Sequence, residues 1–233
     1  MRVLSLGKED YPTVCRLQRA LVEARIEGTI PDVLILVEHP PVLTVGRSGG
    51  CHNILVGREA LAKEGIGVFP VERGGDVTYH GPGQLVGYPI MDLKEQGRDL
   101  HLLLRRYEEV FIRLLAGYGI AGSRIKDLTG VWVGEKKILS IGVAVRRWVS
   151  FHGFAFNINP NLDHFGLINP CGLVDIGMTS LARLLGRPIS RGEVQPRVED
   201  LFASIFHLQL EPWPESSPWQ ELIEEVDESG HDQ

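Results

Sequence analysis

The chain has 233 residues, of which 43% are hydrophobic and 23% are charged, and its formal net charge is −6. This length and composition are typical of one globular domain, with or without a small appendage, and they exclude a largely disordered chain. No apolar run of about 18 residues occurs, and the first residues lack the apolar stretch of a signal peptide, so we expect a cytoplasmic protein with no membrane partner.

The negative charge is concentrated at the C-terminus. Residues 211–233 contain eight acidic residues and no lysine or arginine. Without these eight, 22 of the 30 acidic residues remain, against 24 basic residues, in residues 1–210. We therefore predict one domain over residues 1–210 and an acidic tail over residues 211–233. No dense stripe of basic and aromatic residues occurs, so we expect no nucleic-acid partner.

The first half of the chain predicts one helix followed by short strands. Apolar side chains recur at helical spacing over residues 11–27, after Asp10, a capping residue, and before Gly28, a residue that ends helices. Apolar and β-branched runs then predict several strands. These strands cover residues 33–37, 42–46, 68–71 and 84–90.

The second half combines helices with a hairpin. Residues 99–117 form the clearest predicted helix, because apolar side chains share one face and an aspartate can cap its start. Residues 130–158 are rich in β-branched and aromatic side chains around a Gly-Glu-Lys-Lys turn, which predicts a hairpin and a further strand. Short helices are expected at residues 179–185 and 198–206, the second just after Pro196.

This order of elements predicts an α+β fold, in which helices flank a mixed, mostly antiparallel sheet. The chain contains no internal repeat and no linker long enough to separate two large domains. Trp213 and Trp219 are candidates for attaching the tail to the domain.

Residues 73–89, RGGDVTYHGPGQLVGYP, contain five glycines and two prolines beside many hydrogen-bonding side chains. A connecting loop needs fewer glycines, so this segment is predicted to bring bare backbone close to a bound group. It is not a phosphate-binding loop, because neither the Walker A pattern nor the dinucleotide-binding glycine pattern occurs. That absence counts against ATP as a substrate.

The three cysteines, Cys15, Cys51 and Cys171, include no C-x-x-C pair. We therefore expect neither a disulfide framework nor a metal site. Cys171 lies in an Asn-Pro-Cys-Gly turn, which favours an exposed and rigid position suited to a nucleophile. Cys15 is expected to be buried and inert. Cys51, next to His52, is the alternative nucleophile.

A cysteine becomes a thiolate at neutral pH when a base or a cation lies nearby. The candidates are His80, His152, Lys136 and Lys137, and spacing alone does not decide among them. A lysine in a hairpin turn is most often a solvated surface charge. His80 is more often a hydrogen-bonding loop residue than a catalytic base.

Four segments, in order, resemble the octanoyltransferases of lipoate biosynthesis, also called lipoyl(octanoyl) transferases. They are residues 73–89, EHPPVLTVGR at 38–47, the strand-rich residues 130–158, and NPCGLVDIGMTSL at 169–181. The string Arg-Gly-Gly-x-x-Thr-Tyr-His-x-x-Gly-Gln is highly specific to this family. The segments span most of the chain, and nothing after Leu210 matches.

The resemblance implies the fold of the biotin and lipoate protein ligases and an acyltransferase reaction. An octanoyl (or lipoyl) group arrives on the phosphopantetheine of acyl carrier protein and passes through an enzyme thioester. The acceptor is a specific lysine of the lipoyl domains of 2-oxoacid dehydrogenase complexes and of the glycine cleavage H protein. The resemblance implies no cofactor.

The resemblance also implies the site residues. The acyl-bearing cysteine of the family lies in the Pro-Cys-Gly turn, here Cys171, and the assisting lysine just before an Ile-x-x-Ile-Gly strand, here Lys137. The acyl-binding segments of the family map onto three stretches of this chain. They are Arg73, Gly74, Gly75, Asp76, Val77, Thr78, Tyr79 and His80; Ser140, Ile141 and Gly142; and Gly153, Phe154 and Ala155.

Three alternatives stay open. An ATP-dependent lipoate or biotin ligase would need no catalytic thiol, a cysteine hydrolase would release the free acid, and a non-enzymatic acyl carrier would not turn over. Because acyl carrier proteins are acidic, the donor is expected to dock on a basic patch. Candidates for that patch are Arg124, Lys136, Arg146 and Arg147.

Overall fold

The computed structural model describes residues 1–169 and 177–223, apart from the side chain of Cys51. Its strands are β1 (Arg2–Lys8), β2 (Val33–Glu38), β3 (Val42–Val45), β4 (Gly67–Pro70), β5 (Val77–His80), β6 (Gln84–Ile90), β7 (Ser123–Ile125), β8 (Leu128–Val133), β9 (Lys136–Arg146), β10 (Val149–Asn157) and β11 (Glu211–Pro212). Its α-helices are α1 (Tyr11–Glu27), α2 (Arg58–Lys63), α3 (Leu100–Ala116), α4 (Leu181–Leu185) and α5 (Arg191–Phe206), and two short 3₁₀-helices are η1 (Cys51–Asn53) and η2 (Leu162–Leu167).

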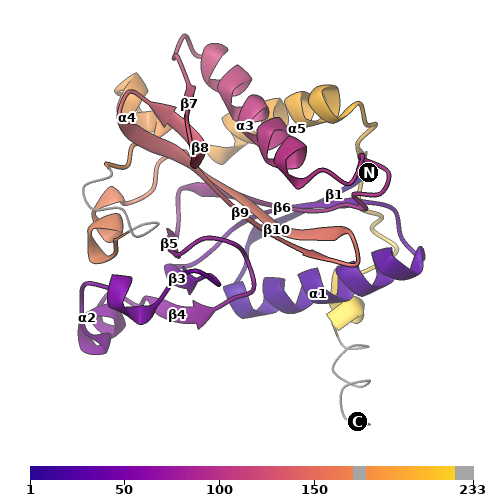
Figure 1. Ribbon diagram of the computed structural model, residues 1–233, viewed down its shortest axis with the longest axis horizontal. Coiled ribbons are helices and arrows are strands. Elements are labelled where there is room, and N and C mark those ends of the chain that lie inside the picture. The colour runs from indigo at the N-terminus through magenta and orange to yellow at the C-terminus, as the bar shows by residue number, and fades with distance from the viewer. Residues whose placement is uncertain (170–176, 224–233) are drawn as a thin grey trace.

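The strands form two sheets. The main sheet has the order β11-β1-β2-β6-β10-β9-β8-β7, and the small sheet has the order β4-β3-β5. In the main sheet, β1 runs parallel to β11 and to β2, and the other neighbouring strands are antiparallel. Helices α3 and α5 cover one face of the main sheet, and α1 lies on the other face beside the small sheet (Figure 1). The predicted α+β fold with a mostly antiparallel sheet is confirmed.

The two long predicted helices are confirmed together with their capping residues. Helix α1 begins after Asp10, whose Oδ1 accepts a hydrogen bond of 3.0 Å from the backbone N–H of Thr13. It ends at Gly28, which adopts φ 78°, a left-handed conformation that glycine adopts without strain. Helix α3 follows Asp99, whose Oδ1 accepts from the backbone N–H of Leu102 at 2.9 Å.

Helix α5 begins earlier than its sequence predicts. Ser190 caps its start by accepting a 3.2 Å hydrogen bond from the N–H of Glu193, so that Pro196 lies inside the helix rather than before it. A proline removes one helical hydrogen bond. The helix continues because Val198 and Phe202 are fully buried against α3 and the sheet, and such packing outweighs local propensity.

Two large hydrophobic cores lie on opposite faces of the main sheet. One joins the sheet to α3 and α5, where the Phe111 ring centroid is 4.9 Å from those of Phe154 and Phe156. The other joins the sheet to α1. Burial on both faces explains the continuous apolar run of β2, which does not alternate with polar residues.

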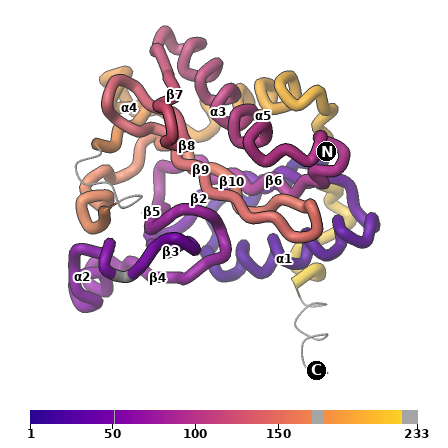
Figure 2. The backbone as a smooth tube through the Cα atoms, viewed as in Figure 1, coloured from indigo at the N-terminus to yellow at the C-terminus, as the bar shows by residue number. Residues whose placement is uncertain are grey.

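The segment after residue 210 returns to the start of the chain. Strand β11 pairs with β1, and Trp213 and Trp219 pack against the core beneath α1, as predicted for these tryptophans. Figure 2 shows this yellow segment beside the indigo N-terminal elements. The division into a domain over residues 1–210 and a tail over residues 211–233 stays a prediction.

Candidate active site

A narrow cavity lies between the main sheet and the glycine-rich segment that leads into β5. Strands β9 and β10 form one wall, the segment around β5 forms the facing wall, and α1 and β6 contribute one residue each at its edge. The lining residues are Tyr11, Arg73, Gly75, Asp76, Val77, Thr78, His80, Tyr88, Lys137, Ser140, Ile141, Gly142, His152, Gly153, Phe154 and Ala155. The three stretches that the resemblance assigns to acyl binding thus meet around one cavity.

Two of the predicted acyl-binding residues lie outside these walls. Gly74 attaches the segment to β9, because its N–H donates a 2.9 Å hydrogen bond to the carbonyl of Val143. Tyr79 points to the other side of β5, as alternation along a strand requires. Its hydroxyl lies 2.8 Å from Nδ1 of His164, and its ring packs against Phe165.

The glycine-rich segment packs closely against β9, and this close packing depends on Gly142. A Cβ atom added to Gly142 would lie 2.9 Å from the carbonyl oxygen of Gly74 and 3.0 Å from Cδ of Arg73. Both distances are shorter than van der Waals contact, so only glycine lets the segment approach β9 this closely. The backbone of the glycine-rich segment and that of β9 therefore meet closely at Gly142.

We expect the substitution Gly142→Ala to lower both the acyl transfer that the resemblance implies, about tenfold, and the stability, because the added methyl group pushes the segment away from β9, and such overpacking costs about 1–3 kcal/mol. Steady-state transfer rates and the thermal midpoint measure both effects. Gly166→Ala is the matched control, since a Cβ atom at Gly166 meets nothing within 4 Å. Equal activity of the two variants would contradict this account.

Arg73 braces the segment from within. It is buried, and its guanidinium donates hydrogen bonds to Thr44 at the carbonyl oxygen (2.7 Å) and at Oγ1 (2.9 Å). It also donates to the carbonyl of Gly74 at 3.0 Å. These contacts hold the turn from β4 to β5 against β3, so this cation lines the cavity and positions its wall.

Lys137 lies in the wall at the start of β9, with only 4% of its surface exposed. Its Nζ is 4.9 Å from the ring centroid of Trp132, a cation–π contact. The usual role of a hairpin-turn lysine, a solvated surface charge, therefore fits Lys136, which is exposed, and not Lys137. A buried ammonium beside a cavity is suited to stabilise an anion or to transfer a proton.

Cys171 lies outside the described residues, so its distance from Lys137 stays untested. The described residues on both sides of it are attached to the site. Gly177 accepts a 2.9 Å hydrogen bond from the N–H of Lys137, and the N–H of Asn169 donates to the carbonyl of Asn53 at 2.8 Å. Asn53 in turn donates through its side chain to Asp76 in the cavity wall.

A cluster of aromatic polar side chains lies at one end of the cavity. Nδ1 of His39 is 2.7 Å from the carbonyl oxygen of Glu9, and its Nε2 is 2.9 Å from the hydroxyl of Tyr88. Burial lowers the pKa of His39 to about 4, so the ring is neutral at pH 7. A carbonyl can only accept, so Nδ1 carries the proton and Tyr88 donates to Nε2.

His80 and His152 are also neutral at pH 7. Burial, and then nearby charged groups that include Arg73, hold the pKa of His80 well below its usual value and lower that of His152 to about 4. Neither imidazole therefore places a positive charge in the cavity. Among the described residues that line the cavity, Lys137 and Arg73 are the cationic ones.

Tyr11 and Tyr88 were not predicted from the sequence, and His152 was predicted only as a candidate base. Tyr11 starts α1 and reaches the cavity because that helix crosses the sheet, which no local pattern signals. Tyr88 lies in the quoted glycine-rich segment, and His39, its partner, lies in EHPPVLTVGR. The presence of both residues in motifs of the family was the sequence signal that could have identified this pair.

Cys15 was expected to be inert, and Cys51 was the alternative nucleophile. Cys15 is half-buried on α1, and burial raises the pKa of its thiol, as expected for an inert cysteine. His52 is exposed, and the side chain of Cys51 is outside the described part of the structure. Within residues 1–169 and 177–223, no group of three metal-ligating side chains gathers and no helix is long and apolar enough to cross a membrane.

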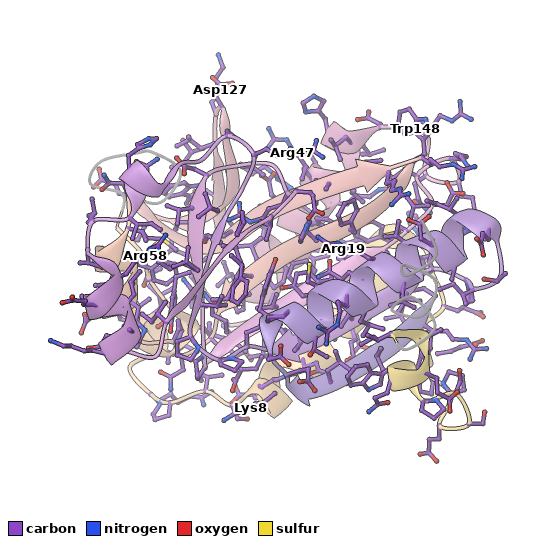
Figure 3. The ribbon with its side chains drawn as sticks, turned by 90° about the horizontal axis from the view of Figure 1, so that it is seen from below. Lys8, Arg19, Arg47, Arg58, Asp127 and Trp148 are labelled. Atoms are coloured by element: carbon purple, nitrogen blue, oxygen red, sulfur yellow. The ribbon has the colours of Figure 1, made fainter. Side chains whose placement is uncertain are left out.

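The predicted basic patch is wrong as a single surface. Lys136 and Arg146 stand at opposite ends of β9, which its eleven residues hold about 33 Å apart. Arg124 forms salt bridges to Glu108 and Glu109 at 2.9 and 2.8 Å, and these two acids also pair with Arg105 and Arg113. Figure 3 shows Trp148, which follows Arg147 at the hairpin tip, across the molecule from α2 and its Arg58.

The site thus has a buried lysine beside a cavity lined by several glycines, between the main sheet and the small sheet. Residues 10–203 match the lipoyl protein ligase A/B catalytic domain, and the chain belongs to this family. It is 49% identical over 208 residues to the octanoyltransferase of Caldicellulosiruptor saccharolyticus, which covers 88% of both chains. It is 45% identical over 210 residues to that of Desulforamulus reducens, which covers 90% of this chain and 92% of the relative.

Solved structures share the fold. A lipoate-protein ligase A bound with ATP superposes with a TM-score of 0.75 at 19% identity, over 97% of this chain and 94% of the other. The bipartite lipoate protein ligase of Thermoplasma acidophilum gives 0.69 at 19% identity, over 98% and 92%. The biotin protein ligase of Aquifex aeolicus gives 0.51 at 16% identity, over 89% and 69%. The predicted family, fold and acyltransferase activity, octanoyl transfer in lipoate biosynthesis, are confirmed.

Proposed function

We propose that this octanoyltransferase takes its acyl group from acyl carrier protein, holds it as a thioester on Cys171 and passes it to a lysine of lipoyl domains, in the cytoplasm and without a cofactor. The acceptors are the lipoyl domains of 2-oxoacid dehydrogenase complexes and the glycine cleavage H protein. The observation that carries the proposal is the position of Lys137, which is buried in the cavity wall and hydrogen-bonded to Gly177.

In the first half-reaction, the Lys137 ammonium stabilises the Cys171 thiolate, which attacks the carbonyl carbon of the carrier-bound thioester. A bond forms between that carbon and Sγ of Cys171, and its bond to the carrier sulfur breaks. The carrier thiol leaves with a proton from Lys137. Backbone N–H groups of Gly172 and of residues 73–80 are our candidates for stabilising the tetrahedral oxyanion.

In the second half-reaction, the amine of the acceptor lysine attacks the acyl-Cys171 carbonyl. An amide bond forms, the bond to Sγ breaks, and neutral Lys137 takes the amine proton, which restores the thiolate–ammonium pair. The first step exchanges one thioester for another and is nearly neutral, whereas the second forms a resonance-stabilised amide and is favourable. Neither step needs ATP.

The test is the intact mass of the enzyme after incubation with octanoyl-carrier protein, with and without a lipoyl domain. We expect the gain of one octanoyl group on Cys171, which is lost when acceptor is added. The Cys171→Ser variant should form no thioester and lose transfer, while Cys15→Ser, in a half-buried position on α1, should keep it.

The same experiment separates the alternatives. A hydrolase would lose its octanoyl group to water without acceptor. An ATP-dependent ligase would keep its activity in Cys171→Ser and require ATP. A non-enzymatic carrier would gain the octanoyl mass but transfer none to the lipoyl domain. Any of these three outcomes would contradict the proposal.

A further inference from the structure

The cavity has a direction set by the register of its two strands. In the pairing of β9 with β10, Ser140 lies opposite Ala155 and Val143 lies opposite His152. Lys137 stands before Ser140 on β9, so His152 marks the opposite end of the cavity. Three residues of a strand span about 10 Å, so the wall between the Ser140 and Val143 levels has the length of a short acyl chain.

Aromatic side chains from three elements close this inner end. They are Tyr11 from α1, Tyr88 from β6 and His152 from β10, with exposed fractions of 4%, 3% and 2%. The ring centroid of Tyr88 lies 6.4 Å from that of His152, and Tyr11 stacks on His80 at 6.3 Å. The inner end is therefore a wall of packed rings rather than an opening.

This wall is polar. Nδ1 of His80 and Nε2 of His152 are buried without a hydrogen-bond partner among the described residues. Oε2 of Glu72 lies 3.8 Å from Nε2 of His152, and Glu72 forms a salt bridge of 2.8 Å with Arg19 of α1, which is labelled in Figure 3. These atoms are already shielded from solvent, so a longer chain would meet packed ring atoms, and displacing such atoms is unfavourable.

We propose that the wall of Tyr11, Tyr88 and His152 sets the longest acyl chain that the enzyme transfers. The chain lies along the backbone of Gly142 and Gly153 with its thioester near Lys137, and its methyl end stops at the wall. Longer chains are rejected because their last methylenes would have to displace these packed rings. This inference rests on the proposed function and deepens it.

The test is His152→Gly. His152 has φ 56°, a left-handed conformation that glycine adopts freely, so this change removes the ring without straining the backbone. The backbone N–H at this position keeps its 2.8 Å hydrogen bond to Oε1 of Gln18. We expect the ratio of decanoyl to octanoyl transfer, measured as kcat/KM with pantetheine thioesters and a lipoyl domain, to rise about tenfold for two newly buried methylenes.

His207→Gly is the matched control, because His207 also has φ 56° but lies exposed at the end of α5. Its ratio should equal that of the wild type. Tyr11→Leu shortens another ring of the wall, so it should raise the ratio several-fold even if His152→Gly does not fold. Unchanged ratios in the folded wall variants would overturn the inference. A wild-type enzyme that forms no thioester with octanoyl-pantetheine would instead overturn the proposed function.

Discussion

Replacing Lys137 with methionine should reduce octanoyl transfer by a factor of about 10³, the scale of general acid–base catalysis. Methionine has similar length and stays packed on Trp132, but it can neither stabilise a thiolate nor transfer a proton. The single-turnover rate of acyl-enzyme formation, followed by intact mass, measures the effect on the first half-reaction. The thermal midpoint, measured alongside, shows whether the variant is folded.

Lys136→Met is the matched control. The two lysines are adjacent on β9, but Lys136 is exposed and Lys137 is buried in the cavity wall. The control variant should transfer octanoyl groups at the wild-type rate from a small thioester donor. Equal losses of activity in the two variants would mean that the effect comes from removing a positive charge from this part of β9 and not from the position of Lys137 in the cavity.

Acidification should destabilise the enzyme well before its carboxylates titrate. The pKa values of His39 and His152 are lowered to about 4 in the folded protein, from 6.5 in an unfolded chain. The folded state therefore resists protonation that the unfolded state accepts. The resulting stability is complete above pH 6.5 and is lost as the pH falls from 6.5 towards 4, by on the order of 3 kcal/mol for each histidine.

Urea unfolding at several pH values between 7 and 5 measures this loss. We expect the free energy of unfolding to fall steeply below pH 6.5. The slope of this free energy against pH counts the protons that are taken up on unfolding, and in His39→Asn it should correspond to up to one proton fewer. The asparagine amide can still donate to the carbonyl of Glu9 but does not titrate. His101→Gln, an exposed position at the start of α3, should leave the slope unchanged. A wild-type slope in His39→Asn would refute the assignment.

Much of the site could be predicted because its residues lie in specific motifs. The resemblance identified most of the residues that line the cavity. Gly142 shows why these walls are rich in small residues, because a Cβ atom added there would collide with Gly74. The helix at residues 11–27 could also be predicted, since Asp10 and Gly28 carry local capping signals. Capping signals of this kind depend on residues within a few positions of the helix end, so they can be read from the sequence without knowing the rest of the fold.

The missed features depend on contacts between distant segments. Strand β5 was missed because the glycines around it favour a loop, and it forms because it pairs with β3. Helix α5 runs through Pro196 because its apolar face is buried. The inner wall joins Tyr11, Tyr88 and His152, which are far apart in the chain, so only the fold brings their rings together.

The pairing of β11 with β1 has a consequence for solubility. An uncovered edge strand offers free backbone donors and acceptors to any other chain, and long flat edges promote intermolecular sheet growth. Here the N–H of Glu211 donates to the carbonyl of Met1 at 3.0 Å, and that of Trp213 to the carbonyl of Val3 at 2.8 Å. With the three-residue β7 at the opposite margin, the sheet ends on both sides in short strands, which offer little free backbone to another chain.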